Sequence, residues 1–147
     1  MTKYLMLMLA GLSTTAIAQA VPPGDWDVTS KVVDLTVPGV PGFLVRMMKG
    51  KSKAERKHLS SGQGIEALLM PDPKARCRID SQRVADGRYA QTLSCPQKKG
   101  DWMRISRMGT YDTAGFTGRA TVTGTTPKGA LNIVLEQRAT HVGRGSR

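Results

Sequence analysis

The sequence has few of the residues that build most metal and redox sites. Its 147 residues include two cysteines and two histidines. A structural zinc site usually takes four closely spaced ligands, and a redox pair is usually Cys-x-x-Cys, so neither pattern fits. His58 and His141 have no obvious partners for a nucleophile–base pair or a metal site, and we expect both to be solvated. We therefore predict no metal and no other cofactor.

Acidic residues are also scarce, with 11 aspartates and glutamates against 22 lysines and arginines. Four aspartates lie on separate loops and strands, so no general acid–base pair is expected among them: Asp72, Asp80, Asp101 and Asp112. Gly-Gln-Gly-Ile-Glu-Ala at residues 62–67 resembles a dinucleotide fingerprint only superficially, because that motif needs a strand before it in a βαβ unit, whereas here a helix is expected before it and the other strands are antiparallel. We predict that the protein is not an enzyme. A hydrolase would need a cleft that gathers His58 with an acid or a nucleophile.

Long apolar runs are absent after the N-terminus, and no later stretch is long enough to span a membrane. The N-terminus itself has a basic residue, Lys3, then an apolar run at residues 5–12 and small-x-small sites that end at Ala18 and Ala20. This pattern is typical of a secretory signal peptide over residues 1–20, cleaved after Ala18 or Ala20. We therefore expect an exported, periplasmic protein in a compartment that permits disulfides.

Basic residues dominate what remains. Only Lys3 is lost with the signal peptide, so 21 basic and 11 acidic residues leave a net charge of +10. Such a charge attracts anions. An exported protein rarely meets nucleic acid, so anionic lipid headgroups, lipopolysaccharide or another anionic envelope component are the expected partners. The simplest alternative is a solvated basic surface without a partner. The oligomeric state stays open.

Residues 77–95 predict a β-hairpin around which the domain is organised. A three-residue loop at 85–87 would pair Val84 with Arg88 and place Cys77 opposite Cys95. We expect these two cysteines to form a structural disulfide. The same pairing sets Asp80 opposite Thr92 and Ile79 opposite Leu93. It predicts one apolar face made of Cys77, Ile79, Ser81, Arg83, Tyr89, Gln91, Leu93 and Cys95.

Three further strands are predicted at residues 102–111, 116–125 and 130–140. Turn residues between them set Tyr111 opposite Phe116 and Thr125 opposite Ala130. Before the hairpin, alternating apolar residues predict strands at 25–37, with a bulge near Asp34, and at 43–48. Ser52 and Glu55 fit a capping box and predict a helix, and a second short helix is expected at 65–70.

The predicted fold is mainly β: a curved antiparallel meander of about seven strands, half-barrel or barrel-like, with one short helical segment beside its apolar face. We expect a single β-rich domain over residues 21–140. The remaining residues, 141–147, are basic and glycine-rich, and predict a flexible tail.

The chain resembles a family of exported proteins of Gram-negative bacteria, domain-of-unknown-function family 3617. The shared features are Pro-Gly-Asp-Trp at residues 23–26, Ser-Lys-Ala-Glu at 52–55, the two cysteines, and Tyr-Asp followed by Phe-Thr-Gly at 111–112 and 116–118. Many members carry another cysteine before the expected helix, where this chain has Met48, so no role of that cysteine carries over. The resemblance implies an exported β-rich domain and no activity.

Arg107 is the main functional candidate, because the predicted register places it on the apolar face opposite Ala120 and near Leu135. An unpaired buried charge is costly, so this arginine needs a partner, a path to the rim or a ligand. Gln137 is expected nearby. We predict a non-catalytic binding or envelope-maintenance module for an amphipathic or anionic ligand, with Arg107 and Gln137 as possible anion-binding residues. The alternative is a structural or protein-interaction domain without a small-molecule ligand.

Overall fold

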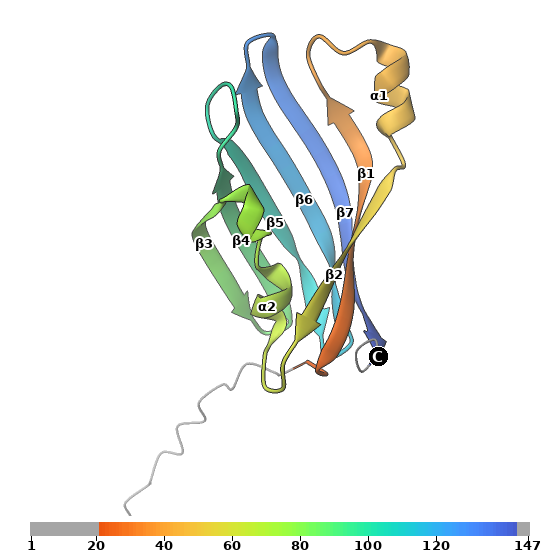
Figure 1. Cartoon of the computed structure of the whole chain (residues 1–147), viewed down its shortest axis with the longest axis vertical. Helices are drawn as coiled ribbons and strands as arrows, with labels where there is room; N and C mark the ends of the chain where they lie inside the picture. The colour runs from red at the N-terminus through yellow and green to blue at the C-terminus, as the bar shows by residue number, and fades with distance from the viewer. Residues whose placement is uncertain (1–20, 144–147) are drawn as a thin grey trace, which may run out of the picture.

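The computed structural model describes residues 21–143 as one seven-stranded sheet with three short helical elements (Figure 1). The predicted signal peptide, residues 1–20, lies outside the described residues. The elements, in chain order, are β1 (Gly24–Thr36), α1 (Gly42–Met48), β2 (Ser52–Leu59), α2 (Ile65–Leu69), the 3-10 helix η1 (Pro73–Ala75), β3 (Arg78–Ala85), β4 (Arg88–Cys95), β5 (Met103–Asp112), β6 (Gly115–Thr126) and β7 (Gly129–Gly143). The mainly β fold class is confirmed, as is the number of strands.

The strands follow the order β2-β1-β7-β6-β5-β4-β3, and every neighbouring pair is antiparallel. A meander from β3 to β7 is therefore extended by β1 and β2, because β1 pairs with β7. The sheet is open, since its edge strands β2 and β3 pair with no further strand of the described chain. Within residues 21–143, none of the helices has the length and apolar character needed to cross a membrane.

The predicted registers of the C-terminal strands are confirmed. Tyr111 pairs with Phe116 across β5 and β6, and Thr125 pairs with Ala130 across β6 and β7. The bulge expected near Asp34 is also present, as a register shift between Val32 and Asp34 where β1 runs beside β7. These pairings place the apolar positions of β5, β6 and β7 on one face, here called the inner face.

The disulfide between Cys77 and Cys95 is confirmed, with an S–S distance of 2.04 Å. The predicted three-residue loop is wrong. The turn has two residues, Asp86 and Gly87, both with positive φ (53° and 75°), so Val84 pairs with Tyr89 and not with Arg88. Two consecutive positive φ angles are typical of a type I′ turn, whose twist suits a hairpin.

A bulge between Ile79 and Ser81 compensates for the shorter turn. Because of it, Ile79 still pairs with Leu93 as predicted, whereas Asp80 does not pair with Thr92. Because side chains alternate along a strand, the extra residue of the bulge moves each later side chain of β3 to the opposite face of the sheet from the one predicted. Ser81 and Arg83 therefore leave the predicted apolar face. Gln82, which pairs with Gln91, joins it.

The secondary structure predicted for two segments is wrong. Residues 43–48, predicted as a strand, form helix α1, and the segment after Ser52, predicted as a capped helix, forms strand β2. A short apolar run fits a strand or a helix equally well, and the leucine, arginine and methionines of α1 favour a helix. Residues 52–59 pair along their whole length with β1, and this ladder outweighs the local capping signal. The short helix expected at 65–70 is confirmed as α2.

Strand β7 continues to Gly143, three residues past its predicted end. Residues 141–143, assigned to a flexible tail, therefore belong to the sheet, and His141 pairs with Trp26 of β1. A long partner strand explains the extension, because β1 supplies hydrogen bonds that no local sequence signal announces. Residues 144–147 lie outside the described part of the chain.

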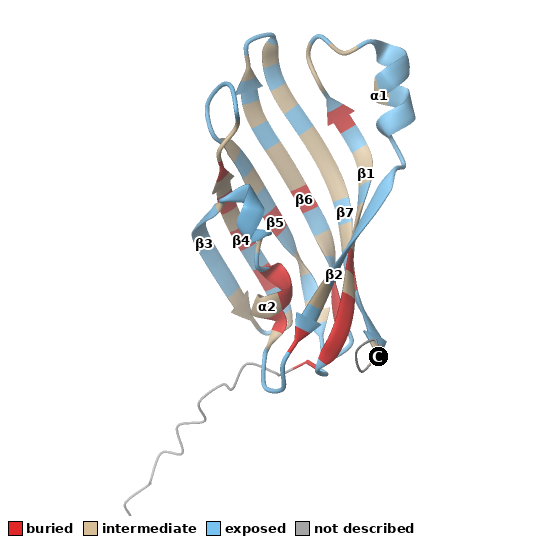
Figure 2. Ribbon diagram, viewed as in Figure 1, coloured by how far each residue is buried: buried red, intermediate tan, exposed pale blue. Residues whose placement is uncertain are grey.

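The core lies at one end of the inner face, where α2 covers the sheet (Figure 2). Its largest buried side chains come from β1, β4, β6 and α2: Trp26, Tyr89, Phe116, Ile65, Leu68 and Leu69. Toward the other end several apolar side chains of the inner face are only half-buried, among them Ile105, Val122 and Leu135, although Leu93 and Leu35 are buried. This uneven cover leaves a cavity beside the core.

Candidate functional site

The cavity lies between the inner face of the sheet, strand β2 and the segment that joins α2 to β3. Its volume is about 530 Å³, within the range of small-molecule sites. Its walls are largely apolar and come from five strands and α2: Val28, Leu68, Leu93, Ile105, Val122 and Leu135. Two polar residues singled out by the sequence, Arg107 and Gln137, line the same space.

Arg107 is buried, with 8% of its surface exposed. Its Nε donates to Gln137 Oε1 at 2.9 Å, which confirms that these two residues are neighbours. Its Nη1 donates to the Leu69 carbonyl oxygen and to Gln91 Oε1, both at 3.0 Å. All three acceptors are neutral. Of the three possibilities for Arg107, the path to the rim is wrong, because its guanidinium lies inside the fold.

The charge of Arg107 has no carboxylate partner among residues 21–143. The guanidinium carbon lies 5.7 Å from the centre of the Phe116 ring, a favourable cation–π distance. Burial lowers the pKa of Arg107 because the charged form loses its hydration. The second terminal nitrogen, Nη2, donates to no protein acceptor in the described chain, which leaves two N–H donors available at the cavity.

A belt of polar side chains crosses the inner face between the core and the cavity. From β3 to β1, the belt consists of Gln82, Gln91, Arg107, Gln137 and Ser30. Gln91 Nε2 donates to Gln82 Oε1 at 2.7 Å, and Gln137 Nε2 donates to the Ser30 hydroxyl at 3.0 Å. A connected network holds each side chain in one orientation. The belt therefore fixes the direction in which the guanidinium presents its remaining donors.

Helix α2 is tied to this belt through its last carbonyl. Leu69 ends α2, and its carbonyl oxygen accepts hydrogen bonds from Arg107 and from Gln91 Nε2, each at 3.0 Å. The carbonyls at a helix C-terminus have no partner within the helix, and a cation there is favourable. Arg107 thus has a structural role, as the C-terminal cap of α2, besides any role toward a ligand.

The rim of the cavity carries charged side chains of β2, namely Lys53, Glu55 and Lys57. They share one face because they alternate along the strand. Lys57 donates to the Met70 carbonyl, and burial lowers the pKa of its ammonium group, while the nearby Glu55 opposes that effect. These residues were expected on a helix, where a spacing of two gives side chains no common direction. Their spacing of two was the signal that could have identified them.

The two histidines are exposed but not without partners. His58 Nδ1 lies 2.9 Å from Asp25 Oδ1, and His141 Nε2 donates to the Pro23 carbonyl oxygen at 2.9 Å. The acid that a hydrolase would require beside His58 is therefore present. No hydroxyl group of residues 21–143 hydrogen-bonds to His58, so the pair lacks a positioned nucleophile. The described residues contain no cluster of three or more potential metal ligands.

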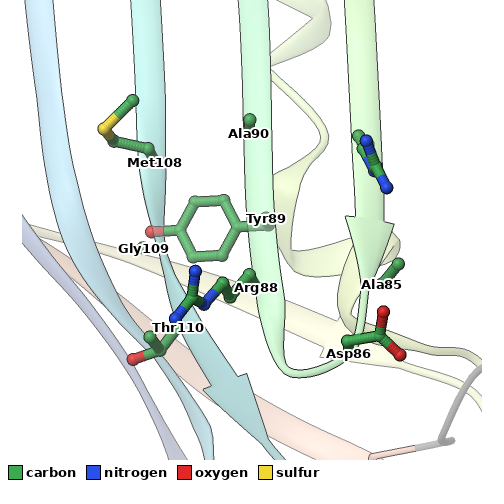
Figure 3. Close-up of a pocket in the computed structure, with 9 residues that line it drawn as sticks. Ala85, Asp86, Arg88, Tyr89, Ala90, Met108, Gly109 and Thr110 are labelled. Atoms are coloured by element: carbon green, nitrogen blue, oxygen red, sulfur yellow. The ribbon is translucent and has the colours of Figure 1, made fainter.

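A second, larger groove of about 920 Å³ lies on the outer face beside the β3–β4 turn (Figure 3). Met108, Arg88 and Thr110 line it, and all three are exposed. Figure 3 also shows the Tyr89 ring with its hydroxyl directed toward Gly109. The groove contains no buried charge and no polar network. The inner cavity is therefore the better candidate, although it is smaller.

Comparison with known proteins gives a family and nothing more specific. The family model described as "Protein of unknown function (DUF3617)" matches residues 21–144. No curated protein and no solved structure matches the chain.

Proposed function

Since the chain belongs to the DUF3617 family, whose description assigns no activity, we propose a function from the geometry of the cavity: the protein is a non-catalytic binding module for an amphipathic anion. The anionic group contacts Nη2 of Arg107, and the apolar part lies along the wall formed by Ile105, Val122 and Leu135. A fatty acid or a single-chain lipid with an acidic headgroup has this chemistry.

The observation that carries the proposal is a buried guanidinium whose hydrogen-bond partners are all neutral and which keeps two donors. Most buried charges are paired, because an unpaired one costs several kcal/mol. An anion at Nη2 supplies the missing charge, and the burial of Arg107 between apolar walls strengthens that attraction. Gln137 supports the site because it fixes the plane of the guanidinium through Nε.

Titration with a fluorescent long-chain fatty acid tests the proposal. We expect the acid to bind and the corresponding alcohol to bind roughly tenfold or more weakly, since a hydrogen bond to a charged group contributes about 1.5–3 kcal/mol. Arg107→Lys keeps the charge but loses the planar donor group, so it should weaken the acid and leave the alcohol unchanged.

A second variant separates binding from folding. Arg107 also caps α2, so its replacement affects stability. Ile105→Trp fills the cavity and leaves the polar belt untouched, and it should abolish binding of both probes while the far-ultraviolet circular dichroism spectrum and cooperative urea unfolding stay native. Equal affinity for the acid and the alcohol, or full binding by Ile105→Trp, would refute the proposal.

Export remains part of the proposal. A disulfide is stable in an oxidising compartment and rare in a reducing one, and the Cys77–Cys95 bond supports a periplasmic location. The alternative function, a structural or protein-interaction domain, is supported by the unpaired edges of β2 and β3. Native mass spectrometry of the protein from its own host distinguishes the two: a bound lipid favours the first function, and a bound protein favours the second.

A further inference from the structure

Helix α1 exposes apolar side chains that the fold does not use. Phe43 and Met47 are 58% and 60% exposed, and Leu44 and Met48 are 38% and 39% exposed. None of the residues of α1 is buried, and only Val45 among its large side chains is half-buried. A folded monomer seldom exposes a contiguous apolar group of this kind unless it meets a partner there.

The four exposed side chains share one side of the helix. At about 100° per residue, Phe43, Met47, Leu44 and Met48 span an arc of about 140°. Val45 lies outside this arc. Arg46 lies outside it as well, near the Phe43 edge. The arc is therefore a continuous apolar surface with a basic border.

The charges around α1 indicate which kind of partner its apolar side would meet. Residues 42–53 contain four basic residues and no acidic residue: Arg46, Lys49, Lys51 and Lys53. One of these cations forms an exposed ion pair, since the Asp34 carboxylate lies 3.6 Å from the Lys49 ammonium. Apolar side chains bordered by cations match the boundary between acyl chains and anionic headgroups in a bilayer.

We propose that α1 docks the protein on an anionic membrane surface, with Phe43, Leu44, Met47 and Met48 inserted into the headgroup–acyl boundary. Arg46, Lys49 and Lys51 contact the lipid phosphates. The inference rests on α1 and the basic residues that follow it, and it stands whether or not the cavity binds a ligand.

The position of α1 gives the docked molecule a direction. Figure 1 shows α1 beside β1 at the end of the sheet opposite α2, and Figure 2 shows the buried core at the α2 end. Docking through α1 therefore turns the half-exposed end of the inner face toward the bilayer and the core away from it.

Flotation with lipid vesicles tests the docking. The full chain should float with vesicles of phosphatidylcholine and phosphatidylglycerol, and much less with phosphatidylcholine alone. Phe43→Ser with Met47→Ser should weaken binding roughly tenfold or more, because the insertion of apolar surface is lost. Met108→Ser is the matched control, since Met108 is 64% exposed on the outer face and should leave binding unchanged.

A spectroscopic readout reports insertion directly. In a Trp102→Phe background, Phe43→Trp gives the protein two tryptophans, the buried Trp26 and one exposed reporter on α1. Its emission should shift to the blue with anionic vesicles and be quenched by brominated acyl chains. The proposal is overturned if Phe43→Ser with Met47→Ser floats as well as Met108→Ser, if the reporter is not quenched, or if the double variant instead converts a dimer to a monomer in sedimentation experiments.

Discussion

Gly118 is a position at which even the smallest possible substitution should be strongly destabilising. It pairs with Gly109 across β5 and β6, and the Tyr89 hydroxyl lies against both glycines. A Cβ atom at Gly118 would meet that hydroxyl, the Met108 carbonyl oxygen and the Gly109 Cα, all closer than 3.0 Å. Two of these three contacts are backbone atoms, so β5 and β6 would have to separate.

The expected cost of Gly118→Ala is about 3 kcal/mol or more, at the upper end of the range for overpacked sites. Gly124→Ala is the matched control on the same strand and the same face. Its nearest neighbours are side-chain atoms, Met103 Cγ at 3.1 Å and Gln97 Nε2 at 3.2 Å, and both can move. The unfolded chain also loses entropy when glycine becomes alanine, which stabilises by about 0.4–1 kcal/mol. We therefore expect Gly124→Ala to stay within about 1 kcal/mol of the parent.

Urea and thermal unfolding of the oxidised protein in a Trp102→Phe background, followed by the fluorescence of Trp26, measure both changes. Trp26 is fully buried, so its emission reports the loss of the core. Gly118→Ala should lower the urea midpoint, and it should lower the melting temperature by roughly 10 °C or more for a domain of this size. Equal stability of the two variants would show that the close packing of β5 against β6 is not what excludes a side chain at Gly118.

Two further predictions concern the buried phenol and the disulfide. The Tyr89 hydroxyl is buried and has no hydrogen-bond partner in residues 21–143, so Tyr89→Phe should raise the unfolding free energy by about 1 kcal/mol. Burial raises the pKa of Tyr89 above its ordinary value of 10.0, so the unfolded chain loses this proton first and the parent loses stability as the pH rises past that value. Urea midpoints at neutral and alkaline pH should fall less for Tyr89→Phe, and an equal fall would contradict the assignment. Replacing Cys77 and Cys95 by serine should cost about 3 kcal/mol, since the bond closes a loop over a separation of 18 residues. Alkylation of the denatured, unreduced parent should add no mass, and two adducts would rule out the bond.

The strands from β5 to β7 were predictable because their information is local. Polar and glycine residues at the turns between Tyr111 and Phe116, and between Thr125 and Ala130, fix the pairing of the adjoining residues. Once those registers were set, alternation placed Arg107 and Gln137 on the same face without further assumptions. The structure places their side chains 2.9 Å apart.

The N-terminal half was less predictable because its structure depends on distant partners. Strand β2 forms along β1, and no residue of the local capping pattern announces that ladder. The bulge beside Asp80 could not be predicted either. It compensates for the shorter turn, so Cys77 and Cys95 lie at the same end of the hairpin whether or not the bulge is present.

The neighbours of Arg107 were in part predictable from local strand pairing and in part dependent on distant segments. Its neighbour Gln137 could be anticipated from strand pairing, whereas the Leu69 carbonyl lies 38 residues away in sequence and comes from a helix that crosses the sheet. Gln91 was recognised on the apolar face, but nothing local indicated that β4 would set it opposite Arg107. The signal that was available for the belt was a polar residue on the apolar face of each of two neighbouring strands, Gln91 on β4 and Arg107 on β5.

The open sheet differs from a closed barrel in how it can deform. In a barrel every strand is hydrogen-bonded to two neighbours, so the barrel cannot widen unless some of these bonds break. Here β2 and β3 are edge strands, and the segment with α2 and η1 connects them in the chain. We therefore expect the distance between β2 and β3 to vary without the loss of any hydrogen bond between paired strands.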